Sequence, residues 1–367
     1  MSSRKKQEPQ PLTAIDLFAG AGGLSLAARN VGIHVLAAVE KFNHACDTYE
    51  RNFIKWQRSS NLPRLYREDI TTEDLPSRLM SELNLNPGEL DILMGGPPCQ
   101  GFSTHRIKDS GIDDPRNDLL LRYFDFVKAL KPKSFVVENV PGLLWARHAD
   151  YLVRFMELVA ESEYTLHGPE PLNARDFGVP QNRKRIFMVG IRNDLESDFQ
   201  WPTATHGDPD ETTLPDLTLT PWTPASKVFK KRIRKNDPNN HFMNPSEDMI
   251  TRFKHTPKNG GSRKDSGFVL PCHEKHNGHK DVYGRIDPGK PGPTMTTACI
   301  NPSKGRFVHP TQNHGITVRH AARFQCFPDN FIFTGGLIAE GIQVGNAVPI
   351  RLGEAILRTA AQSINVL

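Results

Sequence analysis

One cysteine, one glutamate and two arginines in this 367-residue sequence could together carry covalent chemistry. Cys99 follows Gly-Gly-Pro-Pro at positions 95–98, and such a rigid loop holds a side chain at little ordering cost. A thiol has a pKa near ~8.5, so it needs nearby positive charge, which Arg183 and Arg185 on one face of a strand could supply. Glu138 in a closed pocket could hold a proton against a ring that accepts negative charge. Together they predict thiolate attack on an electron-poor ring.

Each of these residues alone has an ordinary structural interpretation. A loop cysteine is more often a buried apolar side chain than a nucleophile. A glutamate at a strand end commonly pairs with a cation, and arginines at a strand start often form a solvated basic surface. The two prolines before Cys99 favour the catalytic interpretation.

A glycine-rich turn, Gly20-Ala-Gly22-Gly23, indicates a nucleoside site, because glycine lets the backbone approach a ligand closely. Ser25 occupies the position of the third glycine of the dinucleotide fingerprint, which disfavours a pyrophosphate ligand. Glu40, at the end of the next strand, could accept hydrogen bonds from both ribose hydroxyls. Asp69 and Ile70 could end a third strand and contact an adenine amine and the adenine face. The alternative is a plain turn with surface acids.

The elements that position these residues follow from apolar runs and punctuation. Strand patterns lie at 14–18, 35–39, 91–94, 134–137 and 185–191, and helical patterns at 24–31, 119–130 and 347–364. This alternation predicts an α/β fold with a Rossmann-like, doubly wound, mostly parallel sheet. Ligands of such sheets bind at the carboxyl ends of the strands, where the glycine turn, Glu40, Cys99 and Glu138 all fall.

The sequence changes character after about Asp194, where Pro, Gly, Asn, Lys and His become frequent. Too many aromatic residues occur there for a flexible tether, so we expect a smaller, loop-rich second domain. The expected organisation is a flexible tail (1–11), a catalytic and cofactor-binding domain (12–193), the loop-rich domain (194–334) and a segment returning to the first domain (335–367).

Charge and cysteine content limit the partners and the compartment. The net charge is +5, and Lys and Arg exceed Asp and Glu by about ten between Lys227 and Arg306, which suits phosphate contacts. Five dispersed cysteines favour free thiols in a reducing compartment. No apolar run could cross a bilayer and the polar start lacks a secretory signal, so we expect a cytoplasmic protein with no membrane partner.

Taken in order, these stretches resemble the cytosine-5 DNA methyltransferase family. The resemblance covers nearly the whole chain, and PPCQ, ENV and QxRxR in this order are jointly specific. The matching stretches are DLFAGAGG at 16–23, Glu40, Asp69-Ile70, GGPPCQGFS at 95–103, ENV at 138–140, QNRKR at 181–185, RHAARFQCFPD at 319–329 and QVGNAVP at 343–349.

The resemblance implies Cys99 as the nucleophile, Glu138, Arg183 and Arg185 around a flipped-out cytosine, and S-adenosylmethionine as the cofactor. The family's cofactor residues fall here on Phe18, Gly20, Gly22, Gly23, Leu24, Glu40, Lys41, Asp69, Ile70, Pro98, Leu119, Asn346 and Ala347. The polar loop from Ser103 to Pro115 resembles the family's lid over DNA.

The family's reaction needs this chemistry because carbon-5 of cytosine is a poor nucleophile. Adding a thiolate to carbon-6 makes carbon-5 enamine-like and able to attack a sulfonium methyl, after which a base removes the carbon-5 proton. The base must leave the duplex stack to be reached, and contacts from a basic second domain would offset that cost.

In the family the variable region, about Asp194 to His314 here, recognises the DNA sequence. Asp281 to Arg285 and Pro293 to Thr296 resemble its ordered end. One departure is His320, where the family has Glu, which puts the packing of that segment in doubt rather than the chemistry.

The sequence suggests a monomeric modification enzyme, acting on double-stranded DNA beside a restriction endonuclease without stable binding. An RNA enzyme acting on transfer RNA is disfavoured, because its Cys-Phe-Thr stretch is absent. A catalytically inactive DNA-binding relative should lack Cys99 or Glu138, and a nicotinamide oxidoreductase has no use for PPCQ. Cys272, His273, His276 and His279 have a spacing that zinc could use, but we expect no metal, because such a loop also suits phosphate contacts.

Overall fold

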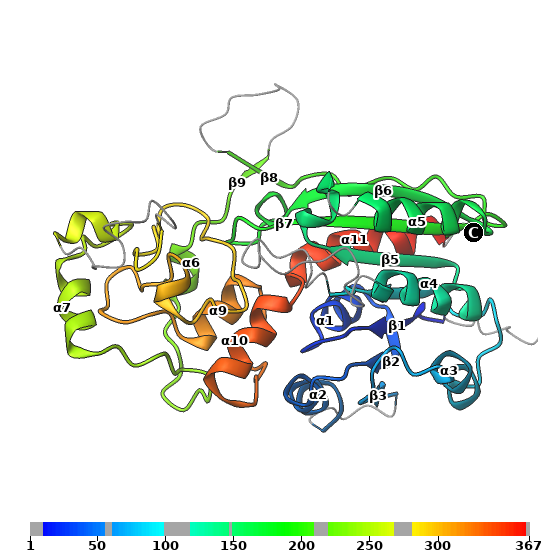
Figure 1. The fold of residues 1–367 in the computed structure, drawn as a ribbon, viewed down its shortest axis with the longest axis horizontal. Coiled ribbons are helices and arrows are strands. Elements are labelled where there is room, and N and C mark those ends of the chain that lie inside the picture. Colours follow the sequence, from blue (N-terminus) through cyan, green and yellow to red (C-terminus); the bar gives the residue numbers. More distant parts are fainter. Residues whose placement is uncertain are drawn as a thin grey trace, which may run out of the picture.

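A seven-stranded sheet forms the centre of the larger part of the molecule (Figure 1). The computed structural model describes residues 10–55, 61–98, 118–146, 149–208, 219–267 and 281–364. The strand order is β3-β2-β1-β4-β5-β7-β6. The strands are β1 (Thr13–Leu17), β2 (His34–Val39), β3 (Arg64–Tyr66), β4 (Ile92–Gly95), β5 (Ser134–Asn139), β6 (Tyr164–Asn173) and β7 (Lys184–Arg192).

The sheet is mostly parallel, and its antiparallel strand β7 carries the candidate site residue Arg185 near its start. β1 to β5 pair in parallel, whereas β7 is antiparallel to β5 and to β6. Glu138 of β5 is opposite Phe187 of β7, and Asn139 is opposite Ile186. The amino end of β7, with Arg185, therefore lies at the same edge of the sheet as the carboxyl end of β5.

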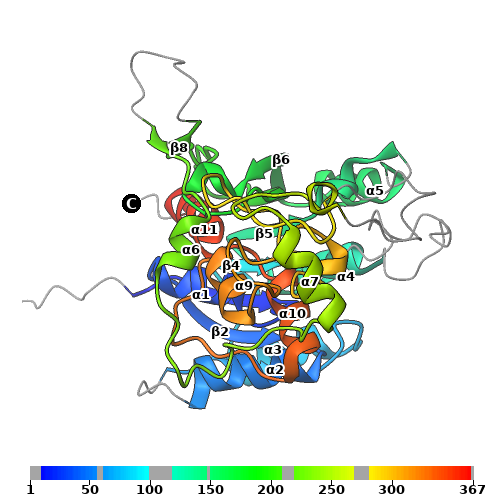
Figure 2. The same ribbon diagram turned by 90° about the vertical axis from the view of Figure 1, so that its left-hand side faces the viewer.

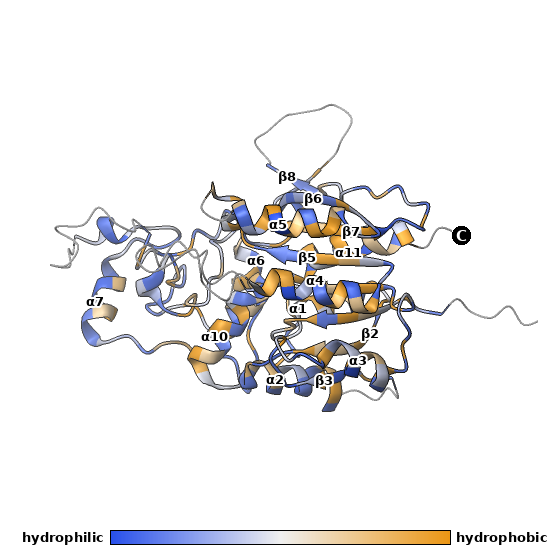
Figure 3. Cartoon of the chain, turned by 45° about the vertical axis from the view of Figure 1, so that its right-hand side comes forward, coloured by the Kyte–Doolittle hydropathy of each residue, from blue (hydrophilic) through white to orange (hydrophobic). Residues whose placement is uncertain are grey.

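Helices cover both faces of the sheet, and alternation along the strands explains how. Val136 of β5 lies in one core with residues of α1 and α11, whereas Phe135 and Val137 lie in the other with residues of α3, α4 and α5. Hydrophobic colour is concentrated in the strands and in the helix faces packed on them (Figure 3). The helices are α1 (Gly23–Asn30), α2 (Asn43–Glu50), α3 (Leu75–Leu83), α4 (Asp118–Leu130), α5 (Ala149–Ala160) and α11 (Ile350–Ile364).

The second part of the molecule contains more loop than regular structure and lies to one side of the sheet (Figures 1 and 2). Its α-helices are α6 (Ser226–Lys230), α7 (Glu247–His255), α9 (Val318–Phe324) and α10 (Gly336–Asn346). The paired strands β8 (His206–Gly207) and β9 (Thr220–Pro221) lie nearer the sheet, where β8 contacts the Ala174–Phe177 turn between β6 and β7. After α10 the chain returns to the sheet, where α11 packs on α1, β5 and β7. Buried Arg285 organises the loops by donating hydrogen bonds to the carbonyls of Thr256, Phe253 and His309.

His320, which stands where the family has Glu, still supports the start of helix α9. Thr317 caps α9 by accepting from the His320 N–H, and Nδ1 of His320 accepts from the Thr317 N–H at 3.3 Å. This reciprocal pair is a capping box, in which Glu or Gln is the usual third residue. Neutral histidine can substitute because its unprotonated ring nitrogen is an acceptor.

The bounds of the predicted elements agree with the structure to within a few residues, but several elements, among them α2, α3 and α5, were not predicted. β3 ends at Tyr66, so Asp69 and Ile70 lie in the turn after it rather than closing the strand. The last helix begins at Ile350, after Pro349, and β6 was not predicted. None of the helices in the described part of the chain is long and apolar enough to span a bilayer.

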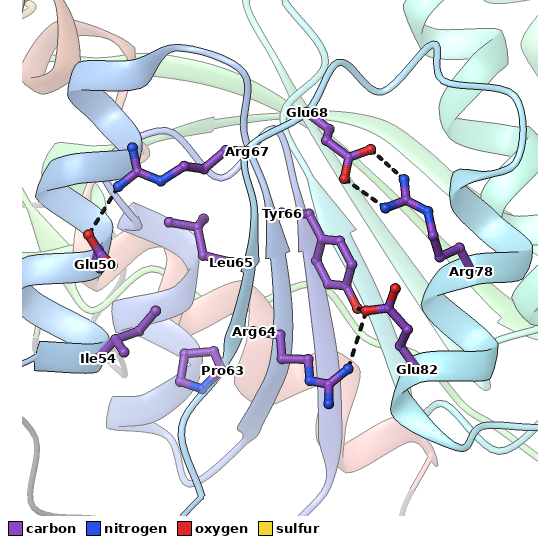
Figure 4. A pocket seen from close by; sticks show the side chains of 10 residues that line it. All are labelled: Glu50, Ile54, Pro63, Arg64, Leu65, Tyr66, Arg67, Glu68, Arg78 and Glu82. Carbon is purple, nitrogen blue, oxygen red and sulfur yellow. Dashed lines mark hydrogen bonds and ion pairs between the residues drawn. The ribbon is translucent and has the colours of Figure 1, made fainter.

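A depression of about 610 Å³ lies along β3, at the end of the strand order (Figure 4). The charged side chains that line it form ion pairs with one another. Arg67 pairs with Glu50, Arg64 with Glu82, and Arg78 with Glu68. β3 is the end strand of the sheet, and charged side chains along such a strand oppose pairing with other chains.

Candidate functional site

Glu138 and Arg185 form a buried ion pair at the carboxyl edge of the sheet. Nε of Arg185 lies 2.8 Å from Oε1 of Glu138, and both side chains are about one-tenth exposed. Burial raises the pKa of Glu138, and the charges of Arg185 and then Arg183 counteract that rise. The raised pKa favours the protonated form of Glu138 more than in a solvated carboxyl group, so the group is suited to act as a proton donor.

The loop that leads to Cys99 begins against this pair. A Cβ at Gly96 would lie 2.9 Å from Oε2 of Glu138, so the carboxylate occupies the space a side chain there would need. The next residue, Asn139, also contacts this loop. Its Nδ2 lies 3.5 Å from the Pro97 carbonyl, and its Oδ1 accepts from the Val140 N–H. The chain therefore passes beside the glutamate at Gly96, three residues before Cys99, and then enters the Pro-Pro segment.

Several predicted residues lie outside the described residues. These are Cys99 itself, the Ser103 to Pro115 loop, and the cluster of Cys272, His273, His276 and His279. Within the described ranges, no group of three His, Cys, Asp or Glu side chains could hold a metal ion.

The sequence predicts that Arg183 and Arg185 both bind the base, but the structure places the Arg183 side chain elsewhere. Its side chain is fully buried, and its guanidinium donates to the carbonyls of Met295, Gly345 and Ala347 at 2.5, 2.7 and 3.1 Å. Burial, and then the charge of Arg185, lower its pKa. Alternation in the sequence indicated a shared face but not the partners, which lie 112 to 164 residues further along the chain.

The glycine turn after β1 has the left-handed backbone that its composition predicts. Phe18, Gly20 and Gly22 have φ of 58°, 56° and 93°. A Cβ at Gly22 would lie 2.4 Å from the Phe53 ring, whereas one at Gly20 would meet nothing within 4 Å. Gly20 therefore borders open space at the carboxyl end of β1. Gly23 is tightly packed instead, since a Cβ there would lie 2.9 Å from the Val348 carbonyl.

Glu40 connects this turn to the end of β2. Its Oε2 accepts from the Gly20 N–H at 2.8 Å, and its Oε1 accepts from the N–H groups of Lys41 and Phe42. Three backbone donors fix the carboxylate, and two carboxylate oxygens have about four acceptor positions. Glu40 thus retains room to accept from a ligand hydroxyl.

Asp69, Ile70 and Leu119 complete the wall on the β3 and α4 side. Lys41 Nζ lies 2.8 Å from Asp69, whose pKa is lowered because bonds from Lys41 and Thr71 outweigh the opposing effect of burial. The Ile70 carbonyl accepts from Arg122 of α4, and Ile70 and Leu119 share one core cluster. At the other side Leu24 is buried in α1, Pro98 is half-buried, Ala347 is buried and Asn346 is exposed.

A buried polar network beneath the turn was not predicted. Oδ2 of Asp16 accepts from the Ser25 hydroxyl at 2.6 Å, and Ser25 Oγ lies 2.9 Å from the Tyr49 hydroxyl. Burial raises the pKa of Asp16 to about 7, with the Ser25 bonds opposing that rise. The signal in the sequence was Ser25 itself. The serine found in place of the third glycine ties α1 to β1.

A family model described as the C-5 cytosine-specific DNA methylases matches residues 12–362. The chain belongs to this family. The methylase is 36% identical over 348 residues to the Type II methyltransferase M1.HphI of Haemophilus parahaemolyticus, covering 94% of this chain and 85% of the relative. It is 32% identical to M.XorII of Xanthomonas oryzae pv. oryzae, over 93% and 82% of the two chains.

The fold of the methylase also matches solved structures. A candidate DNA modification methyltransferase encoded within an Escherichia coli prophage aligns with a TM-score of 0.70 and 25% identity, over 96% of this chain and 99% of that chain. The methylase thus transfers a methyl group to carbon-5 of cytosine in DNA and uses S-adenosylmethionine as its methyl donor.

The described residues fit a nucleoside methyl donor. The open space beside Gly20 and the acceptor capacity of Glu40 suit a ribose, while buried Ile70 and Leu119 offer an apolar wall to a base. Such a ligand would lie at the carboxyl ends of β1 and β2, two and three strands from Glu138 on β5 in the sheet order.

Proposed function

We propose that the methylase modifies one cytosine of a specific double-stranded DNA sequence through a covalent bond between Cys99 and carbon-6 of the flipped base. The observation that carries this proposal is the buried Glu138–Arg185 pair, held against Gly96 three residues before Cys99. The pair supplies a proton and a positive charge, the two electrostatic requirements of thiolate addition to the ring.

The steps assign one task to each group. The Cys99 thiolate adds to carbon-6 while Glu138 gives a proton to ring nitrogen-3, which accepts the displaced electrons. Arg185 faces the base carbonyl and holds Glu138 in place. S-adenosylmethionine supplies the methyl group that carbon-5 takes up. A base then removes the carbon-5 proton, and the returning electrons expel the thiolate as Glu138 regains its proton.

The loop-rich part, residues 194–334, is assigned to target recognition. Described basic residues of α6 and α7 include Lys227, Lys230, Arg252 and Lys254, on the part of the molecule that lies beside the carboxyl edge of the sheet. Phosphate contacts from such residues provide affinity that does not depend on sequence and help to offset the cost of base flipping.

We further propose that the enzyme is the modification half of a restriction–modification system. Relatives at 30% identity or more are named Type II methyltransferases and match along 93% or more of this chain. The free thiols of Cys46, Cys299 and Cys326 suit the reducing cytoplasm, where a bacterial genome is methylated. We expect a monomer that acts without a stable complex with its endonuclease.

Sequencing of methylated cytosines tests the proposal. The gene is expressed in cells that lack cytosine methylation, and their DNA is sequenced after bisulfite treatment. We expect one recurring sequence to carry 5-methylcytosine, and Glu138→Gln to reduce its methylation at least 100-fold. Lys184→Gln, which removes an exposed charge beside Arg185, is the matched control and should keep wild-type methylation. DNA without any modified sequence would overturn the proposal.

A further inference from the structure

Arg183 joins three segments that are far apart in the sequence. It precedes β7, its Nη1 donates to the Met295 carbonyl, and its Nη2 donates to the carbonyls of Gly345 and Ala347. None of its surface is exposed. The three carbonyls belong to the end of the recognition region and to the junction of α10 with α11.

The recognition region is fastened to the same stretch by further bonds. Met295 donates its N–H to Gln181 at 2.6 Å, so its peptide groups are bound by both Gln181 and Arg183. The Asn182 N–H donates to the Gly292 carbonyl, and the Thr294 hydroxyl donates to the Asn182 carbonyl. Gly292, Thr294 and Met295 are therefore all bonded to residues 181–183.

The junction of α10 and α11 contacts both the recognition region and the glycine turn. A Cβ at Gly345 would lie 2.3 Å from the backbone of Thr296, and one at Gly23 would lie 2.9 Å from the Val348 carbonyl. Displacement of the recognition region would press on α10, and displacement of α10 would press on the turn that borders the cofactor space. Interiors packed this closely transmit such displacements.

Arginine is required at this point by geometry. The guanidinium has five donors in a rigid fork, so it can serve carbonyls on two segments at once, whereas lysine offers one compact ammonium. The Gly345 carbonyl is at the carboxyl end of α10, where the helix dipole favours a cation. Within the described residues, the two Nη groups of Arg183 donate only to backbone carbonyls, and its Nε is buried without a hydrogen-bond partner.

We propose that Arg183 is a positioning residue that couples DNA binding to cofactor binding. The inference rests on the proposed function. DNA held by the recognition region fixes the position of residues 292–297, and Arg183 transfers that position to Gly345 and Ala347. Ala347 in turn lies against Gly23 of the glycine turn. Arg185 lies two residues further along the chain, so a shift of Arg183 also moves Arg185 and, through their ion pair, Glu138. Binding of one ligand therefore favours binding of the other, and by linkage the effect is reciprocal.

The test measures the coupling directly. The dissociation constant of a duplex carrying the methylated sequence is determined with and without S-adenosylhomocysteine, and the ratio is the coupling factor. We expect a factor of at least fivefold in the wild type and close to one in Arg183→Lys, which keeps the charge and loses the fork. In Arg183→Lys kcat should fall more than the KM for DNA rises, because the base pocket loses its setting.

Arg285→Lys is the matched control. Arg285 is also buried and also donates to backbone carbonyls, but within the described residues none of its hydrogen bonds reaches β7 or the α10–α11 junction. It should lower the melting temperature and keep the wild-type coupling factor. Unchanged coupling in Arg183→Lys, or equal loss in both variants, would overturn the inference.

Two further outcomes separate this inference from the proposed function. A wild-type enzyme that methylates its sequence but shows no coupling would contradict only the role of Arg183. If Arg183→Lys does not fold, hydrogen exchange on the wild type decides. Added duplex should protect the amides of residues 343–350, and an unchanged exchange rate there would refute the coupling.

Discussion

The guanidinium of Arg185 lies 2.8 Å from the carboxylate of Glu138, although the two residues come from strands that run in opposite directions. The reversal of β7 makes this contact possible, because it brings the start of one strand to the end of the other. Burial raises the pKa of a carboxyl group and a neighbouring cation lowers it. For Glu138 burial is the stronger influence, so its pKa is raised.

Replacing Arg185 with Gln should shift the pH dependence of the enzyme. Arg185 lowers the pKa of Glu138, so its removal raises that pKa further and keeps Glu138 protonated to higher pH. We expect the high-pH decline of kcat to move upward while the maximal rate falls at least tenfold. Initial rates of methyl transfer from pH 6 to 10 measure this, with Lys184→Gln as the control. A decline at the wild-type pH would contradict the assignment.

Three glycine variants separate cofactor binding from folding. Gly20→Ala and Gly32→Ala both impose a positive φ on alanine with nothing within 4 Å of the new methyl, so each should cost about 1–2 kcal/mol. Only Gly20 borders the proposed cofactor space, so only Gly20→Ala should weaken S-adenosylhomocysteine binding, by tenfold or more. Gly22→Ala places its methyl 2.4 Å from a carbon of the Phe53 ring and should lower the melting temperature most. Calorimetry and thermal melts distinguish the three, and equal affinities for Gly20→Ala and Gly32→Ala would refute the site.

The recognition region should lose stability in acid because it buries neutral histidines. Burial lowers the pKa of His320 to about 3 and that of His309 to about 4. The unfolded chain binds their protons below about pH 6.5, so their contribution is complete above that pH and is lost as pH falls towards 4 and 3.

His320→Gln should flatten this acid dependence, since Gln fills the same capping-box position without titrating. Melting temperatures from pH 7.5 to 4 measure it, with exposed His255→Gln as the control. Parallel curves for His320→Gln and the wild type would count against buried histidine as the cause.

Asp16→Asn should stabilise the fold at alkaline pH. The folded pKa of Asp16, about 7, lies above the unfolded value, so its contribution is complete below about pH 3.8 and is lost as pH rises through 7. Asn has the same shape and can still accept from Ser25. The melting temperature of the variant relative to the wild type should therefore rise between pH 5 and pH 8, and a constant difference would show that Asp16 does not titrate in this range.

The strands that were predicted best are those buried on both faces. Runs such as those of β4 and β5 are continuously apolar and end at glycine or at Glu-Asn, which marks their type and their ends. β6 gave no such signal, because its middle is partly exposed and contains a Gly-Pro pair. The direction of β7 was also unpredictable, since a local pattern does not say which neighbour a strand joins.

Some residues of the candidate site could likewise be placed from the sequence, and others could not. Gly20, Glu40 and Glu138 could be placed from sequence because each lies at or just after the end of a clear strand pattern, and strand ends share one edge of a parallel sheet. The partners of Arg183 could not, because they come from residues 295 to 347 and depend on how the recognition region folds back. His320 shows the same limit, since its role depends on Thr317 and on neutral burial rather than on its chemical type.

Covalent trapping tests the central claim most directly. A duplex with 5-fluorocytosine at the methylated position should form a denaturant-stable complex with the enzyme, because fluorine cannot leave as a cation and elimination stops. The account predicts that the complex requires S-adenosylmethionine, maps to Cys99 and disappears in Cys99→Ala. A complex that forms equally well with the alanine variant, or full turnover by Cys99→Ser, would contradict it.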